Sequence, residues 1–203
     1  MKYRDFEEKI NRPIFRVNDS DFLRLNIYNS QLSLWKKQNY LSNIKKGIYL
    51  FNKQVNDIDK KHLAYLLYQP SYISLELALS YYGLIPEVVQ TVTSITPKTT
   101  RRFQNIKGKF IYRNIKKELY WGYDIVSLGN NGKFLLAQPE KALLDYLYLN
   151  KSKINNVDDV RELRLNSVYF KKIININKLK KYLKEFSSVR LCNIVKLILQ
   201  TYA

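Results

Sequence analysis

The stretch NSQLSLWKKQNYLSNIKKGIYLF, residues 29–51, combines a helical pattern with two short β-forming runs. Leu32 and Trp35 have the spacing of one buried helix face, and polar side chains surround them. The runs LSNI and IYLF, residues 41–44 and 48–51, are joined by the turn-forming residues KKG. We therefore expect a helix over NSQLSLWKKQN, followed by a β-hairpin.

Two shorter helices are expected before this stretch. Tyr3, Phe6 and Ile10 are spaced as the buried side of a helix, and Pro13 cannot continue it. Asn18 is suited to cap a second helix that begins just after it. Three short helices and a hairpin are the order of a winged helix-turn-helix, whose third helix enters the major groove of DNA. The alternative is a packing unit of the same elements that binds no ligand.

The polar side of the third helix and the hairpin turn supply the candidate DNA contacts. Gln31, Ser33 and Lys36 are expected to approach base edges. The lysines at the end of the helix and in the hairpin are expected to contact phosphates, which position a helix without reading sequence. The full set of candidate DNA-binding residues is Asn29, Ser30, Gln31, Ser33, Lys36, Lys37, Lys45 and Lys46.

Beyond residue 54 the sequence indicates a mixed α/β domain. A helix is expected over LELALSYYG, which Ser71 or Ser74 is suited to cap, and another begins at Pro139, a residue that suits the first helical turn. The runs TVTSIT, KFIYRN, DIVSL and KFLLAQ predict a small antiparallel or mixed sheet. One of its turns is expected at Asn130, Asn131 and Gly132.

The last third of the chain reads as helical. Segments 160–165, 178–186 and 189–202 carry the apolar spacing of helices. The fold class is therefore expected to be α+β, with a winged helix-turn-helix over residues 1–54 and a domain over residues 55–203 that contains a small sheet and C-terminal helices.

The chain carries a strong positive charge. Its 203 residues include 35 Lys and Arg against 17 Asp and Glu, a formal net charge of +18. Such a charge attracts nucleic-acid backbones or anionic membrane surfaces. The abundance of Lys, Asn, Ile and Tyr, which share A/T-rich codons, offers a compositional explanation for part of the excess.

Residues 99–117 contain seven cationic side chains and no acidic one. This block is a second candidate surface, which would extend a DNA footprint or serve the second domain's own activity; the alternative is a solvated basic loop. Its candidate binding residues are Arg101, Arg102, Lys107 and Lys109.

The residues needed for common enzymatic sites are scarce. His62 and Cys192 are the only histidine and cysteine, so the usual zinc ligand sets cannot form within one chain. Neither glycine-rich signature of a phosphate-binding loop occurs. Cys192 is expected to be a small buried residue. We expect no catalytic activity, no cofactor and no metal.

A metal-dependent nuclease remains the enzymatic alternative, because such an enzyme needs only carboxylates around divalent ions. Glu140 and Asp145 are the most suggestive pair, but residues five positions apart on a helix point about 140° away from each other. The candidate carboxylates are Glu118, Asp124, Glu140 and Asp145. No run approaches the length needed to cross a bilayer, so a cytoplasmic protein is expected.

Several motifs in the order found here resemble the AbiEi family of antitoxins. They are the hairpin letters IKKGIYLF, the stretch PSYISLELALSYYGLIPE at residues 70–87, TSIT, TTRRF, and AQPEKALLDYLYL at residues 137–149. The resemblance covers about residues 15–150, and the last 50 residues match less distinctly.

The resemblance implies the antitoxin of a type IV toxin–antitoxin pair, linked to abortive phage infection. Such an antitoxin binds inverted repeats in its own promoter through the winged helix and represses transcription. It also counteracts a nucleotidyltransferase-like toxin without forming a stable complex with it, and the C-terminal domain carries much of that activity.

Two other functions are compatible with the sequence. One is an RNA-binding protein that protects the nucleic-acid target of the toxin, in which aromatic residues of KFIYRNIKKELYWGY stack on unpaired bases. The other is a DNA-binding regulator that acts alone, without a toxin.

Overall fold

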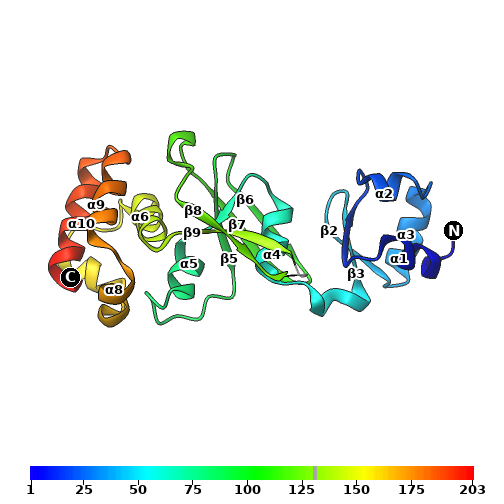
Figure 1. The fold of residues 1–203 in the computed structure, drawn as a ribbon, viewed down its shortest axis with the longest axis horizontal. Helices are drawn as coiled ribbons and strands as arrows, with labels where there is room; N and C mark the ends of the chain where they lie inside the picture. Colours follow the sequence, from blue (N-terminus) through cyan, green and yellow to red (C-terminus); the bar gives the residue numbers. More distant parts are fainter. Residues whose placement is uncertain (130–131) are drawn as a thin grey trace.

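The computed structural model describes residues 1–129 and 132–203 of an elongated molecule. The chain proceeds from one end to the other: short N-terminal elements, a central sheet, and helices that include the C-terminus (Figure 1). The fold is mixed α+β, with small sheets and C-terminal helices. Asn130 and Asn131, where we expected a turn, lie outside the described residues.

The N-terminal elements comprise short helices and a three-stranded antiparallel sheet of order β1-β3-β2. The expected helices and hairpin are present, but strand β1 was not expected, because three residues are too few to show an alternating pattern. Gly47 turns the hairpin with a φ of 76°, a conformation that favours glycine. The elements are α1 (Tyr3–Ile10), β1 (Ile14–Arg16), α2 (Ser20–Leu23), α3 (Asn29–Lys37), β2 (Leu41–Lys45) and β3 (Ile48–Phe51).

An aromatic cluster holds these elements together. Phe6 stacks on Trp35 with ring centroids 4.8 Å apart, and Phe15 stacks on Phe22 at 5.5 Å. Each of these four side chains is at most 6 % exposed. Because every helix contributes a ring, the cluster fixes the position of α3 against α1, α2 and the sheet.

Strand β3 contributes to two cores. Phe51 belongs to the aromatic cluster, whereas Ile48 and Leu50 belong to the larger hydrophobic cluster that continues through the rest of the chain. Successive side chains of a strand point to opposite faces, so both faces of the small sheet are covered. The N-terminal elements are therefore packed against the remainder of the molecule through β2 and β3.

The larger sheet has six strands in the order β6-β7-β5-β4-β9-β8 among the described residues. It is mixed, since β4 runs parallel to β9 and β5 parallel to β7. Its elements, with those that lead into it, are η1 (Asn52–Asp57), α4 (Lys60–Leu67), β4 (Tyr72–Ile73), α5 (Leu75–Tyr81), β5 (Val92–Thr96), β6 (Arg101–Asn105), β7 (Gly108–Asn114), η2 (Lys117–Leu119), β8 (Tyr123–Ser127) and β9 (Lys133–Ala137).

Helices cover both faces of this sheet. Tyr112 of β7 donates a hydrogen bond to the carbonyl of Ala64 in α4 at 2.7 Å. Tyr72 of β4 points to the opposite face and donates to Asp145 in the next long helix at 2.9 Å. The sheet therefore lies between α4 on the side of the N-terminal elements and the C-terminal helices on the other (Figure 1).

The C-terminal part begins with Pro139 at the first helical position, as expected. The helix expected over 160–165 ends earlier, because Arg164 takes a φ of 50°. A further helix then begins, and Asn166 caps it by accepting hydrogen bonds from two backbone N–H groups. The helices are α6 (Pro139–Asn150), α7 (Val157–Glu162), α8 (Ser167–Ile173), α9 (Ile176–Glu185) and α10 (Val189–Tyr202). Within residues 1–129 and 132–203, no helix is both long and apolar enough to cross a membrane.

Candidate nucleic-acid interface

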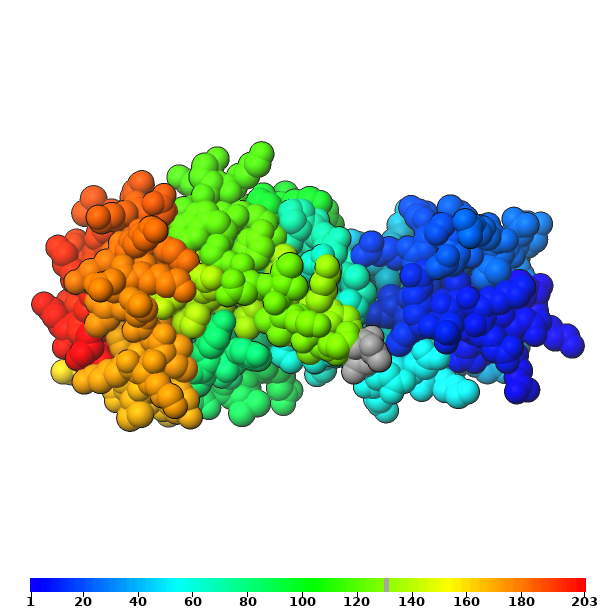
Figure 2. Space-filling view, in the orientation of Figure 1, coloured from blue at the N-terminus to red at the C-terminus, as the bar shows by residue number. Residues whose placement is uncertain are grey.

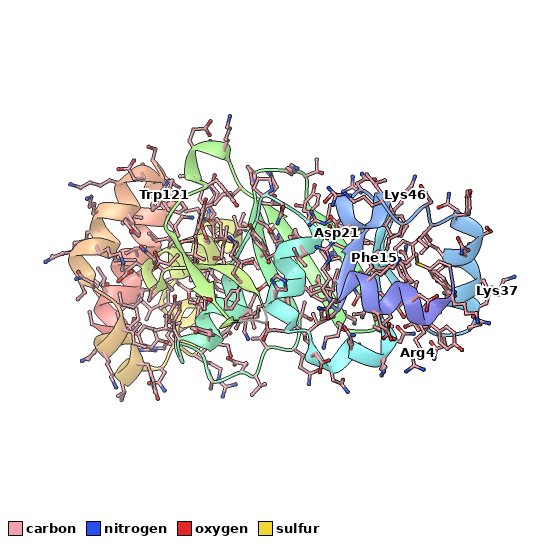
Figure 3. The ribbon with its side chains drawn as sticks, turned by 45° about the vertical axis from the view of Figure 1, so that its right-hand side comes forward. Arg4, Phe15, Asp21, Lys37, Lys46 and Trp121 are labelled. Carbon is pink, nitrogen blue, oxygen red and sulfur yellow. The ribbon has the colours of Figure 1, made fainter. Side chains whose placement is uncertain are left out.

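Helix α3 presents a polar face to solvent at the end of the molecule. Leu32 and Trp35 are buried, and the opposite side of the helix carries Ser30, Ser33 and Lys37, all exposed. Figure 3 shows Lys37 at the tip of the N-terminal elements, directed away from the rest of the protein. This polar face is therefore accessible from solvent.

The flanks of α3 are less available than its outer face. Gln31 was expected outside the helix, but it is half-buried: its Oε1 accepts from the backbone N–H of Tyr28 at 3.1 Å, and its Nε2 donates to the carbonyl of Met1 at 3.2 Å. Asn29 and Lys36 are exposed beside the outer face. Gln31 therefore serves the start of α3 and is the weakest of the helical candidates for reading bases.

An apolar side chain shares the outer face of the helix. Leu34 is 51 % exposed between Ser30, Ser33 and Lys37. Leu34 is not among the residues expected from the sequence to contact DNA, because a leucine in a helical pattern resembles a core position. An exposed methyl group on such a face is suited to contact the methyl group of thymine.

The two hairpin lysines take different positions. Lys46 is exposed at the turn (Figure 3). Lys45 is half-buried, and its ammonium group donates to the carbonyl of Leu67 at 2.6 Å, at the end of α4. Of the two, Lys46 is the one whose charge is left to solvent at the turn.

The second basic block does not form one surface. In the antiparallel register Gln104 faces Lys109, so Arg102 and Lys109 lie on one side of the β6–β7 hairpin, where both are exposed. Arg101 lies on the other side. Lys107 is in the turn, and its ammonium group donates to the carbonyl of Val55 at 2.8 Å. Register thus divides four residues that are close in sequence.

The acidic candidates are occupied by contacts within the protein. Asp145 is fully buried and forms an ion pair with Lys141, and it accepts from Tyr72 and from Ser74, each at 2.9 Å. Burial raises the pKa of Asp145 and lowers that of Lys141, while the attraction between the two charges opposes both shifts. Glu140 faces the other way.

Glu140, 2 % exposed, packs against α9. Its Oε1 accepts from the backbone N–H of Asn175 at 2.9 Å, and its Oε2 lies 3.1 Å from Lys178 Nζ. The two carboxylates of α6 therefore do not share a face, as the helical spacing predicts. Asp124 accepts from the side chain of Gln138, and Glu118 is exposed. Among the described residues no group of three or more His, Cys, Asp or Glu is placed to hold a metal ion.

The aromatic residues of KFIYRNIKKELYWGY belong to the core. Phe110 and Tyr112 are fully buried, and Tyr120, Trp121 and Tyr123 are half-buried. The Trp121 ring (Figure 3) packs edge-on against Tyr182 at 4.8 Å. None of these five rings is offered as a stacking platform for unpaired bases.

The sole histidine and the sole cysteine take no part in this surface. His62 is half-buried on α4, and its Nδ1 lies 2.7 Å from the backbone carbonyl oxygen of Lys133 and 3.2 Å from the backbone nitrogen of the same residue. Cys192 is a free, half-buried thiol on α10.

No protein-family model matches this sequence, and no curated protein matches it either.

Proposed function

We propose that the N-terminal elements form a winged helix that binds duplex DNA and that α3 enters the major groove. The observation that carries the proposal is the exposed face of α3 with Ser30, Ser33 and Lys37, at the free end of the molecule. The element order helix, strand, helix, helix and hairpin supports it, because a winged helix places its recognition helix just before the hairpin.

The proposed contacts follow from this orientation. The hydroxyl groups of Ser30 and Ser33 form hydrogen bonds with base edges, and Leu34 contacts a thymine methyl group. Lys37 and Lys46 neutralise phosphates on either side of the groove and so position the helix. Asn29 and Lys36 supply further polar contacts at its flanks.

The biological role we propose is that of an AbiEi-type antitoxin, which represses its own promoter at inverted repeats and counteracts a nucleotidyltransferase-like toxin. The ordered motifs between residues 15 and 150 support this role. Recognition of the promoter is assigned to the N-terminal elements, and toxin antagonism to the second region, residues 55–203. The buried aromatic residues favour this proposal over RNA binding by base stacking.

An electrophoretic mobility shift tests the DNA proposal. The full chain is titrated against the DNA upstream of its own gene and against scrambled DNA of equal length, at about 0.15 M salt, because salt alone sets much of the affinity. Ser30→Ala combined with Ser33→Ala is expected to remove the preference for upstream DNA, whereas Lys37→Ala is expected to weaken binding to both DNAs alike. Base contacts are worth about 1–3 kcal/mol each.

The matched control is Lys180→Ala, which removes an exposed lysine from α9 at the opposite end of the molecule. This variant is expected to bind like the unmodified protein. Equal retardation of both DNAs by the unmodified protein would contradict sequence-specific repression and move RNA binding to first place.

A further inference from the structure

Cations from three separate segments converge on the end of α4. Arg16 of β1 donates through Nη2 to the carbonyl of Leu66 at 3.1 Å. Lys45 of β2 donates to the carbonyl of Leu67 at 2.6 Å, and Lys98, between β5 and β6, donates to the carbonyl of Gln69 at 2.7 Å. Carbonyl groups at a helix C-terminus lack partners within the helix and carry its negative dipole end, which favours cations there.

A fourth cation joins them around Tyr68. The ammonium groups of Lys45 and Lys98 lie 5.5 and 5.8 Å from the centroid of the Tyr68 ring. Arg101 lies on the same side of β6 as Phe103, and the Phe103 ring is also 5.5 Å from the Lys45 ammonium group. We call Arg16, Lys45, Lys98 and Arg101 the junction cluster.

The junction cluster has no acidic counterpart. Among the described residues, no carboxylate lies within 4.0 Å of any of these four cations, although Arg12, on the same N-terminal elements, pairs with Asp19 at 2.9 Å. Burial lowers the pKa of Lys45, and the charges of Arg16, Arg101 and Lys98 lower it further, while Tyr68 opposes them. Repulsion between these like charges disfavours the arrangement, and a bound anion would relieve it.

The cluster has donors to spare and is open to solvent. An ammonium group has three N–H donors and a guanidinium group five, and each observed carbonyl contact uses one. Lys98 and Arg101 are exposed. Arg16 is half-buried and lines a cleft of about 480 Å³ between β1 and α4, whose walls also carry Asp19 and Asp57. Figure 2 shows this part of the molecule as a waist, where the N-terminal elements meet the rest.

We propose that the junction cluster binds a phosphate group of the nucleic-acid backbone. Charge-assisted hydrogen bonds from lysine and arginine to phosphate oxygens are strong, and a phosphate would supply the missing negative charge. The identity of this ligand as flanking DNA rests on the proposed function. In that case, DNA that flanks the segment held by α3 contacts the junction, and both parts of the protein contact the same duplex.

The first test compares two duplexes. Fluorescence anisotropy measures binding of the full chain to a short duplex that covers one recognition site and to the same duplex extended by one helical turn on each side. The unmodified protein is expected to bind the extended duplex at least about tenfold more tightly, with a salt dependence steeper by about one unit per added phosphate contact. Lys98→Ala combined with Arg101→Ala is expected to lose this gain and to keep the short-duplex affinity.

The matched control is Lys116→Ala combined with Lys117→Ala, which also removes two exposed cations from the second region but leaves the cluster intact. It is expected to keep the gain. An equal gain in the Lys98 and Arg101 variant would overturn the assignment to flanking DNA.

A second test needs no DNA. Tripolyphosphate is expected to raise the melting temperature of the unmodified full chain and of the control, because a ligand that binds only the folded state stabilises it, and to raise that of the Lys98 and Arg101 variant less. An equal rise in all three proteins would overturn the phosphate site and leave the cations as helix caps only. A selective rise without duplex binding would uphold the site and contradict the proposed function.

Discussion

The buried ion pair of α6 shows how one side chain depends on its neighbours. Lys141 and Asp145 are both fully buried, and the Lys141 ammonium group also donates to the Tyr72 hydroxyl at 2.8 Å. The ring of Trp121 lies 5.1 Å from that ammonium group. Taking two charges out of water is costly, and only this complete set of partners offsets the cost.

Removing the carboxylate should therefore destabilise the protein strongly. In Asp145→Asn the Lys141 charge stays buried without its counter-charge, and we expect the free energy of unfolding to fall by about 3–5 kcal/mol. Urea denaturation followed by circular dichroism measures the change. The double variant Lys141→Met with Asp145→Leu removes both charges and should recover part of that loss, because the hydroxyl groups of Tyr72 and Ser74 then lose their acceptor. A double variant as unstable as the single one would contradict this explanation.

At the level of elements, the length of each helix or strand determined whether its sequence pattern could predict it. Helices α3, α9 and α10 span enough turns for apolar periodicity to locate them to within a few residues. Strands β1 and β4 contain three and two residues, so neither shows an alternating pattern. They exist because a neighbouring strand supplies hydrogen-bond partners, which is a tertiary property.

Helix α3 depends on the aromatic cluster rather than on its own propensity. It has nine residues, and isolated helices of that length are marginal in water. Trp35→Ala should cost about 3–5 kcal/mol, since the side chain is 4 % exposed and stacked on Phe6. In limited proteolysis, the Trp35→Ala variant should be cleaved first within residues 1–51, whereas the Trp35→Phe variant should resist cleavage there.

The corresponding control lies in the other core. Phe170 of α8 is 1 % exposed, and Phe170→Ala should expose the C-terminal helices to cleavage instead. The same cleavage pattern for Trp35→Ala and Phe170→Ala would show that the two cores unfold as one unit and would contradict the separate role of the aromatic cluster.

On the scale of the whole molecule, the basic charge is distributed over several surfaces. The outer face of α3 is one such surface. The junction cluster and the side of the β6–β7 hairpin that carries Arg102 and Lys109 are two others, and they share strand β6 but lie on its opposite sides. Positive charge alone indicates attraction to phosphates, and the placement of each cation decides which task it can serve. This separation allows the proposed promoter binding and the proposed toxin antagonism to be tested independently.

Charge reversal on the β6–β7 hairpin tests the proposed toxin antagonism. Arg102→Glu with Lys109→Glu should abolish rescue of cell growth from the nucleotidyltransferase-like toxin, because both side chains share one exposed side. Promoter binding should stay within about twofold, since screening limits the effect of distant surface charges. Growth after co-expression of both proteins is the measurement, with Lys180→Glu and Lys184→Glu on α9 as the control. Full rescue by the Arg102 and Lys109 variant would exclude this hairpin side from antitoxin activity.

The sequence by itself determined the α+β class, the sites of the longer helices, the hairpin at KKG and the positive charge. These properties follow from local periodicity, turn chemistry and composition. It also separated Glu140 from Asp145, because helix geometry alone sets their directions.

Only the tertiary structure decided which cationic side chains are free to contact a ligand and which are bound to other parts of the protein. Lys45 and Lys46 are adjacent in sequence, yet one donates to the end of α4 and the other faces solvent. Arg101 and Arg102 are likewise adjacent and lie on opposite sides of β6. The physical reason is that strand register and helix ends far apart in the chain choose the partner of each side chain, and no local pattern encodes that choice.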